Sequence, residues 1–259
     1  MLLAVDVGNT QTVIGVFERE RLERHWRISS QADRTPDELA LIFQGLLGQT
    51  GLSFSKQVTG VVISSVVPRM TQAMREMTER YFMFPPVVVG PGVKTGLAIL
   101  TDNPKEVGAD RVVNAVAAHS LFGGSCIVID FGTATTVDAV SAKGEYLGGA
   151  IAPGVEISTN ALVSMGAQLK RVEFTAPKHV AGKSTDEAIR SGVIYGFAGQ
   201  VDAIVQRMRE ELGGDPTVVA TGGLAPVITP HMRVPAKNEP WLTLIGLRLV
   251  FDRNAASPD

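Results

Sequence analysis

The sequence predicts a mixed α/β protein made of two similar domains that face each other. Short apolar stretches typical of buried strands alternate with amphipathic stretches that open on helix-capping residues. A strand–turn–strand unit around Asp6 also recurs around Asp130, 124 residues later in a chain of 259 residues. Because a repeat copies the whole supersecondary unit, we expect one domain over residues 1–117 and a second over 118–259, with a helix near 241–252 that could pack back on the first.

The opening unit covers residues 3–17, and its first strand ends by presenting the Asp6 carboxylate. Gly8 lets the backbone approach a ligand closely, and the polar residues after it offer hydroxyl, amide and main-chain N–H groups. Such a turn suits an anion and the carboxylate suits its counter-ion, which indicates a place for a nucleotide phosphate with its metal. The same residues also allow a plain β-hairpin, in which Gly8 and Asn9 supply only turn geometry.

The rest of the first half continues with strands and helices. Thr35, Pro36 and Glu38 form the pattern of a capping box at a helix start, and Pro68 starts a second helix. The stretch 60–67 is mostly apolar on both faces, as in a parallel sheet. The strands expected here cover residues 21–28, 60–67 and 87–89.

The second half repeats the opening pattern. Setting Asp6 on Asp130 places Gly8 on Gly132, Thr12 on Thr136 and Val13 on Val137. Ser184 and Glu187 predict a second capping box at the start of a long helix. The other elements expected here are helices over 110–121, after 154, over 184–212 and over 241–251, a strand–turn–strand unit over 127–137, and strands over 148–154 and 217–223.

The composition favours small-molecule partners. A net charge of −2, from 24 basic and 26 acidic residues, leaves no electrostatic footprint for nucleic acid or an anionic membrane. No uncharged apolar run reaches the roughly 18 residues of a membrane span, and the first residues lack a basic leader, so we expect a cytoplasmic protein. The single cysteine, Cys126, lies in an apolar run and is expected to be a buried core thiol.

Several motifs resemble a known superfamily. Asp-Val-Gly-Asn-Thr at residues 6–10 and Asp-Phe-Gly-Thr at 130–133 resemble the two phosphate motifs of the superfamily of acetate and sugar kinases, heat-shock chaperones and actin. Thr-Gly-Gly at 221–223 resembles its adenosine motif. Within that superfamily, residues 102–115 and 182–192 resemble the signatures of type III pantothenate kinases.

This resemblance implies a fold of two ribonuclease-H-like domains, a duplicated actin-like ATPase architecture, around a central cleft. It also implies ATP-dependent phosphorylation of the primary hydroxyl of pantothenate, the first step of coenzyme A biosynthesis, by a homodimer. The cofactors implied are Mg²⁺ with ATP and a monovalent cation, K⁺ or NH₄⁺, held by Asp130. The residues implied to bind ATP are Asp6, Val7, Gly8, Asn9, Thr10, Gln11, Thr12, Val13 and Thr133.

For pantothenate, the resemblance implies binding by Gly108, Ala109, Asp110, Arg111 and Thr185, with Asp110 as the catalytic base. The chain departs from the family at one position, since Thr101 stands where a tyrosine that contacts the substrate is common.

The residues by themselves leave simpler alternatives for three of these positions. Asp110 could be a helix N-cap, Asp130 a turn residue at a strand end, and Thr185 only the second residue of a capping box. The four histidines show neither metal-ligand spacing nor a nearby nucleophile, so we interpret them as structural or surface residues.

Two other functions are compatible with the same fold. One is a nucleotide-binding regulatory protein, because some relatives have been named transcription accessory factors, although the chain lacks a basic patch. The other is a phosphatase or ATPase in which water replaces the pantothenate hydroxyl. Asp110 and Arg111, within a complete signature, favour the kinase.

Overall fold

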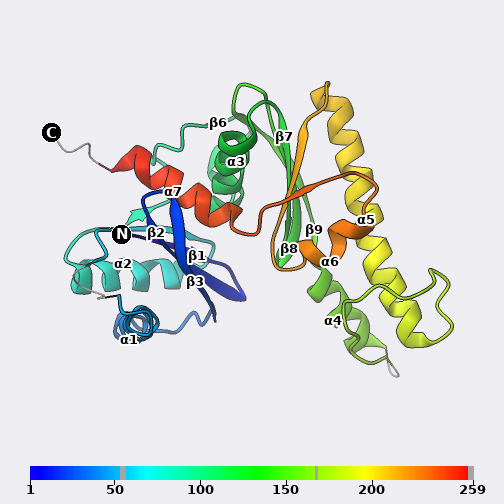
Figure 1. Ribbon diagram of the computed structural model, residues 1–259, viewed down its shortest axis with the longest axis horizontal. Helices are drawn as coiled ribbons and strands as arrows, with labels where there is room; N and C mark the ends of the chain where they lie inside the picture. Colours follow the sequence, from blue (N-terminus) through cyan, green and yellow to red (C-terminus); the bar gives the residue numbers. More distant parts are fainter. Residues whose placement is uncertain (53–56, 167–168, 256–259) are drawn as a thin grey trace. The chain divides into compact units, whose positions relative to one another are not determined.

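The computed structural model describes residues 1–52, 57–166 and 169–255 (Figure 1). In that part of the chain, the contacts separate two compact units. Unit 1 holds Met1–Leu97, Asn103–Ala117 and the segment that starts at Leu242, and unit 2 holds Ala98–Asp102 and Ala118–Trp241. Each unit is therefore assembled from stretches that are distant in the sequence.

Each unit combines strands with helices. Unit 1 contains β1 (Leu2–Val7), β2 (Gln11–Glu18), β3 (Arg21–Ser29), α1 (Pro36–Gly48), β4 (Gly60–Ser65), α2 (Pro68–Phe82), β5 (Val87–Val88), the short helix η1 (Pro104–Glu106), the first part of α3 (Ala109–Phe122) and α7 (Leu242–Asn254). Unit 2 contains β6 (Ala98–Ile99), the end of α3, β7 (Cys126–Phe131), β8 (Ala134–Val140), β9 (Glu145–Pro153), α4 (Val155–Met165), α5 (Thr185–Leu212), β10 (Thr217–Thr221), α6 (Ala225–Ile228), η2 (Thr229–His231) and β11 (Lys237–Asn238).

The two sheets share one strand order. The order is β3-β2-β1-β4-β5 in unit 1 and β11-β10-β7-β8-β9-β6 in unit 2. In the reverse direction, starting at β9, the second sheet runs β9-β8-β7-β10-β11, which matches the first sheet strand for strand. The strand β6 is added beside β9. In both sheets the first two strands form an antiparallel hairpin, and β4 or β10 lies parallel to the first strand. The predicted duplication is confirmed.

In unit 1, α1 and α2 cover one face of the sheet. Val5 and Val7 of β1 pack there against Phe43 of α1 and Met74 of α2. Side chains alternate between the two faces of a strand, so Asp6 lies on the opposite face, the face on which α7 contacts β1, β2 and β4. Unit 1 thus has a helical layer on each side of its sheet.

The predicted start of α1 is confirmed. Thr35 Oγ1 accepts the backbone N–H of Glu38 at 3.3 Å, and Glu38 Oε2 accepts the backbone N–H of Thr35 at 2.8 Å. The hydrogen bond from the Thr35 backbone is the main cause that lowers the pKa of Glu38 from its ordinary value. The sequence pattern therefore places this helix start correctly.

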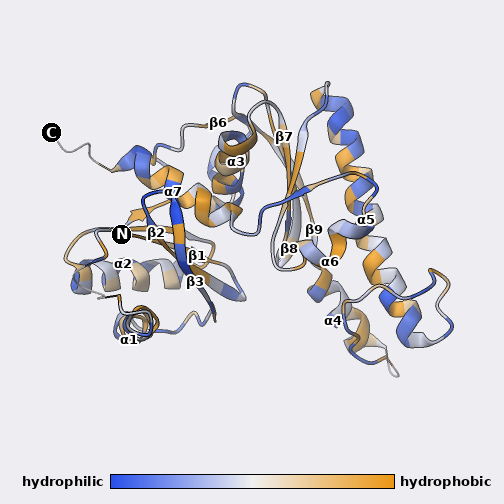
Figure 2. Cartoon of the chain, in the orientation of Figure 1, coloured by the Kyte–Doolittle hydropathy of each residue, from blue (hydrophilic) through white to orange (hydrophobic). Residues whose placement is uncertain are grey.

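In unit 2, α5 supplies much of the core. Ile194, Val201 and Val205 of this helix are fully buried and pack in one cluster with Ile127 and Ile129 of β7. Figure 2 shows apolar and polar stretches alternating along α5, as expected for a helix with one buried face. Among the helices of the described residues, none is both long enough and apolar enough to cross a membrane.

The predicted alignment of the two hairpins is wrong by one residue in the second strand. Val7 pairs with Thr12, whereas Phe131 pairs with Thr135, so the turn of the second hairpin is one residue shorter. Thr12 therefore corresponds to Thr135 rather than to Thr136. The burial agrees, because Thr12 is 0% and Thr135 2% exposed.

Two strands escape prediction from the sequence. β6 and β11 each contain two residues, too few to show the period of two that marks a strand. β6 pairs with β9 and β11 pairs with β10, so both extend the sheet of unit 2.

Candidate functional site

The turn between β1 and β2 is held in place by Ser30, which directly follows β3. Gly8 N–H donates to the Gln11 carbonyl at 3.0 Å, which closes the turn, and Ser30 N–H donates to the Thr10 carbonyl at 2.9 Å. The hydroxyls of Thr12 and Ser30 lie 2.8 Å apart in a hydrogen bond. Asn9, Thr10 and Gln11 are exposed. The turn therefore presents polar groups to solvent on a backbone that two neighbouring strands fix.

Asp6 lies at the end of β1 with two partners on the same face of the sheet. It pairs with Val13 of β2 and with Ser64 of β4, and its own side chain is half-buried. Ser64 is fully buried, and its Oγ has no hydrogen-bond partner among the described residues. Sequence reasoning missed Ser64, although its position at the carboxyl end of a parallel strand is where ligands bind in α/β sheets.

The matching turn of unit 2 brings Asp130 close to Gly222. Asp130 is the penultimate residue of β7 and lies in register with Thr221 of β10, and Gly222 follows Thr221 with a φ of +93°. A Cβ atom at Gly222 would lie 2.6 Å from Asp130 Oδ1 and 2.6 Å from the Phe131 carbonyl oxygen. Gly222 is thus packed closely against Asp130 and Phe131, which joins the predicted cation ligand to the adenosine-like motif.

The start of α4 packs against the same turn. A Cβ atom at Gly154 would collide with the Thr133 carbonyl oxygen and would lie 2.7 Å from the Gly132 carbonyl oxygen. Thr133 itself is exposed at the tip of the turn. The sequence pattern of the β9–α4 connection predicted a turn but not this contact, which makes Gly154 a further residue of the candidate site.

The predicted pantothenate residues lie at the start of α3. Gly108 precedes the helix and accepts the backbone N–H of Val112 at 3.1 Å, while Ala109 is the first helical residue. Asp110 Oδ1 accepts the backbone N–H of Arg111 at 2.8 Å, and both side chains are half-buried. The alternative that Asp110 is the N-cap is wrong, because this residue lies inside the first turn of the helix.

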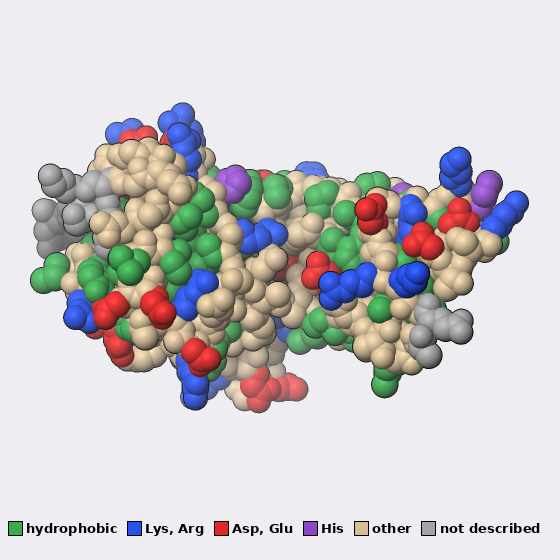
Figure 3. All heavy atoms as spheres, turned by 90° about the horizontal axis from the view of Figure 1, so that it is seen from below, with side chains coloured by type: hydrophobic (Ala, Val, Ile, Leu, Met, Phe, Trp, Pro, Cys, Tyr) green, Lys and Arg blue, Asp and Glu red, His purple; other side chains and the backbone are tan. Residues whose placement is uncertain are grey.

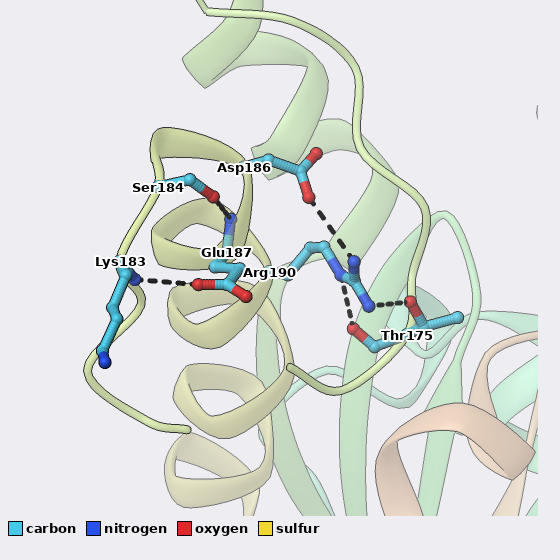
Figure 4. Close-up of polar contacts among 6 residues, drawn as sticks. All are labelled: Thr175, Lys183, Ser184, Asp186, Glu187 and Arg190. Atoms are coloured by element: carbon cyan, nitrogen blue, oxygen red, sulfur yellow. Dashed lines mark hydrogen bonds and ion pairs between the residues drawn. The ribbon is translucent and has the colours of Figure 1, made fainter. Parts of the chain in front are cut away.

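Thr185 is the first residue of α5 and is exposed. Ser184 Oγ accepts the backbone N–H of Glu187 at 3.2 Å, as predicted. The Glu187 carboxylate, however, accepts the N–H of Lys183 at 2.8 Å, one residue before the expected partner (Figure 4). The start of the helix is therefore capped from two successive residues.

A second contact secures the same turn of α5. Arg190 Nε donates to the Thr175 carbonyl at 2.9 Å, and the Arg190 guanidinium also binds the Thr175 hydroxyl and lies 3.4 Å from Asp186 (Figure 4). The irregular segment before α5 is thus tied to the helix on which Thr185 lies.

Thr101, the position at which the chain departs from the family, follows β6. Its Oγ1 is buried and has no hydrogen-bond partner among the described residues.

Comparison with known proteins identifies the family. The family model described as type III pantothenate kinase matches residues 2–207 of the chain. The chain belongs to the type III pantothenate kinase family. A type III pantothenate kinase of Streptomyces griseus is 56% identical to this family member and covers 99% of both chains.

Solved structures show the fold of this family member. A conserved Campylobacter jejuni protein, described as a Baf family transcriptional activator, gives a TM-score of 0.63 at 16% identity, covering 97% of this chain and 98% of its own. An inorganic polyphosphate/ATP-glucomannokinase from Arthrobacter sp. strain KM gives a TM-score of 0.52 at 14% identity and covers 99% of both chains. At such identities the likeness shows the fold alone, and that fold is the predicted pair of ribonuclease-H-like domains shared by actin-like ATPases and sugar kinases.

Within this pantothenate kinase family member, the described residues contain no group of three histidine, cysteine or acidic side chains that could hold a metal ion.

Proposed function

We propose that this chain transfers the terminal phosphoryl group of ATP to the primary hydroxyl of pantothenate, which gives 4′-phosphopantothenate in the first step of coenzyme A biosynthesis. The observation that carries the proposal is the near full-length identity of 56% to a type III pantothenate kinase. The duplicated hairpins support it, because phosphoryl transfer depends mainly on positioning and on charge neutralisation.

We assign the turn of unit 1, residues 6–13, and Thr133 of unit 2 to the ATP phosphates. Backbone N–H groups of a tight turn form an anion-binding concavity, and the exposed polar tip of the first turn offers such groups. Asp6 is half-buried beside this turn and would contribute a carboxylate to the Mg²⁺ that accompanies ATP. Mg²⁺ supplies charge neutralisation at the phosphates when it is bound.

We assign the start of α3 and Thr185 to pantothenate. Asp110 would take the hydroxyl proton as the oxygen bonds to the γ-phosphorus and the bond from that phosphorus to the bridging β–γ oxygen breaks. Arg111 would pair with the pantothenate carboxylate, for which its guanidinium has the matching geometry. Support for these roles comes from the match of residues 108–111 to the family signature.

We also propose that Asp130 holds a monovalent cation, K⁺ or NH₄⁺, together with the Phe131 carbonyl. The support is that the Asp130 carboxylate and the Phe131 carbonyl both lie beside Gly222, where they could offer oxygen ligands. Such a cation would add positive charge beside the phosphate turn of unit 2. Activity that is unchanged between K⁺ and Na⁺ buffers would contradict this assignment.

The remaining proposals concern the setting of the reaction. We propose a homodimer, which light scattering would test, and a cytoplasmic location, where ATP is available as a substrate. Small-molecule substrates agree with the surface, since Figure 3 shows acidic and basic side chains interspersed on the face in view.

The test is the release of ADP, measured with a coupled assay with and without pantothenate. We expect turnover that requires pantothenate. ATP hydrolysis that pantothenate does not change would support the ATPase alternative, and ATP binding with no turnover in either condition would support a regulatory protein.

A further inference from the structure

Helix α7 packs directly on the backbone of the unit 1 sheet. A Cβ atom at Gly15 of β2 would lie 2.7 Å from the Leu244 side chain, and one at Gly60 of β4 would collide with the Phe251 ring. Both glycines are in strands next to β1, and α7 covers the face on which Asp6 lies. The Leu244 and Phe251 side chains of α7 therefore reach the backbone of the two strands that flank the Asp6 strand.

The same helix touches α3 one turn after the proposed pantothenate residues. A Cβ atom at Gly246 would collide with the Val113 carbonyl oxygen and would lie 2.6 Å from the carbonyl carbon. Thr243 Oγ1 donates a hydrogen bond to Asn114 Oδ1 at 2.7 Å. Asn114 is 1% exposed and Thr243 is half-buried, and both residues belong to unit 1.

Asn114 is coupled to the candidate site by helix geometry. It follows Asp110 by four residues and Arg111 by three, and residues at these spacings lie on one face of an α-helix. A shift or rotation of α3 at Asn114 would therefore move the Asp110 carboxylate and the Arg111 guanidinium together.

We propose that α7 positions α3 against the Asp6 strand, with Thr243 and Gly246 as positioning residues for the phosphoryl transfer. Thr243 acts through Asn114: its hydroxyl fixes the rotation of α3, while the close approach at Gly246 fixes the separation of the two helices. This inference rests on the proposed function, because it predicts that the contact between Thr243 and Asn114, one helical turn from Asp110, affects phosphoryl transfer to pantothenate.

The experiment compares Thr243→Val with Thr243→Ser. Valine keeps the shape of threonine but cannot donate to Asn114, whereas serine keeps the hydroxyl. We expect Thr243→Val to reduce kcat/KM for pantothenate about three- to tenfold, the worth of one hydrogen bond, with the KM for ATP unchanged, and Thr243→Ser to restore the wild-type value. Thr243→Ala replaces the valine variant if that variant does not fold.

A second measurement does not depend on catalysis. Backbone amide exchange in residues 111–114 should accelerate in Thr243→Val and return to the wild-type rate in Thr243→Ser, while exchange in β1 stays unchanged. Wild-type protein without pantothenate-dependent turnover would overturn the proposed function only. The positioning role would be overturned if Thr243→Val left kcat/KM for pantothenate unchanged. It would also be overturned if both variants lost kcat/KM equally for ATP and for pantothenate.

Discussion

Asp110 is the residue on which the proposed chemistry depends most directly. Its carboxylate accepts the N–H of Arg111 at 2.8 Å, a contact that the side-chain oxygen of asparagine can keep. Asp110→Asn should therefore preserve the start of α3 while removing the proton acceptor. We expect kcat to fall about 10²- to 10⁴-fold, and ATP binding, measured by calorimetry, to persist.

The matched control for that variant is Asp33→Asn in the same unit. The Asp33 side chain is 89% exposed and lies 3.2 Å from Arg69, an exposed pair of small energetic value. This control should turn over at the wild-type rate. A rate for Asp110→Asn near that of the control would show that Asp110 is not the base.

Cys126 is predicted to be inert in the folded protein. Burial raises the pKa of its thiol to about 11, against a smaller lowering by Lys237. Because the thiolate is the reactive form, a thiol reagent at pH 8 should not label the native protein but should label one thiol per chain in denaturant. Rapid labelling without denaturant would contradict the burial of this strand.

The raised thiol pKa also has a consequence for stability, with a definite sign. The folded state favours the protonated thiol. The contribution of Cys126 to the free energy of unfolding is therefore complete below the ordinary thiol pKa of 9.0 and is lost as the pH rises through about 11.

At the scale of elements, the β9–α4 connection packs against the turn of unit 2 that we assign to the ATP phosphates. A side chain at Gly154 would collide with the Thr133 carbonyl oxygen, so Gly154→Ala should displace the turn. We expect the KM for ATP to rise about tenfold or more, since small displacements in a reacting geometry are costly. Steady-state kinetics with varied ATP would measure this.

Gly199→Ala is the control for that change, because a Cβ atom at Gly199 would meet nothing within 4 Å. It should leave the KM for ATP unchanged. If Gly154→Ala also leaves it unchanged, α4 does not position the turn.

Sequence patterns predict the regular elements well and the connections less well. The capping box of Thr35 and the apolar stretch of β4 depend on local contacts, and the structure has both where they were expected. The shorter turn of the second hairpin leaves no local signal, because Thr135 and Thr136 are both threonine. Which of them is buried is decided by pairing with Phe131 and not by residue type.

The residues of the candidate site also fall into those that local sequence patterns predict and those that they do not. Asp6 and Asp130 stand out because each ends an apolar strand before a glycine-containing turn. Ser64 and Gly154 do not stand out, because their significance depends on a neighbouring strand and on a turn that are distant in sequence. Contacts of this kind become visible only when the chain is folded.

At the scale of the whole molecule, α7 belongs to the unit whose strands begin the chain. Leu247 of this helix is fully buried, so Leu247→Ala should destabilise the protein by about 2–5 kcal/mol. Hydrogen exchange should show the loss of protection in β1, β2 and β4. Loss confined to β7 and β10 would show that α7 does not stabilise unit 1.

The position of α7 also sets an order for folding during synthesis. All strands of unit 2 lie between residues 98 and 238, so that unit can complete its sheet before α7 is made. The face of the unit 1 sheet on which Asp6 lies stays uncovered until α7 is made, because β4 ends at Ser65 and α7 starts only at Leu242. At a synthesis rate of about 5–20 residues per second, that apolar face remains uncovered for roughly 9 to 35 seconds, during which we expect it to be open to chaperones.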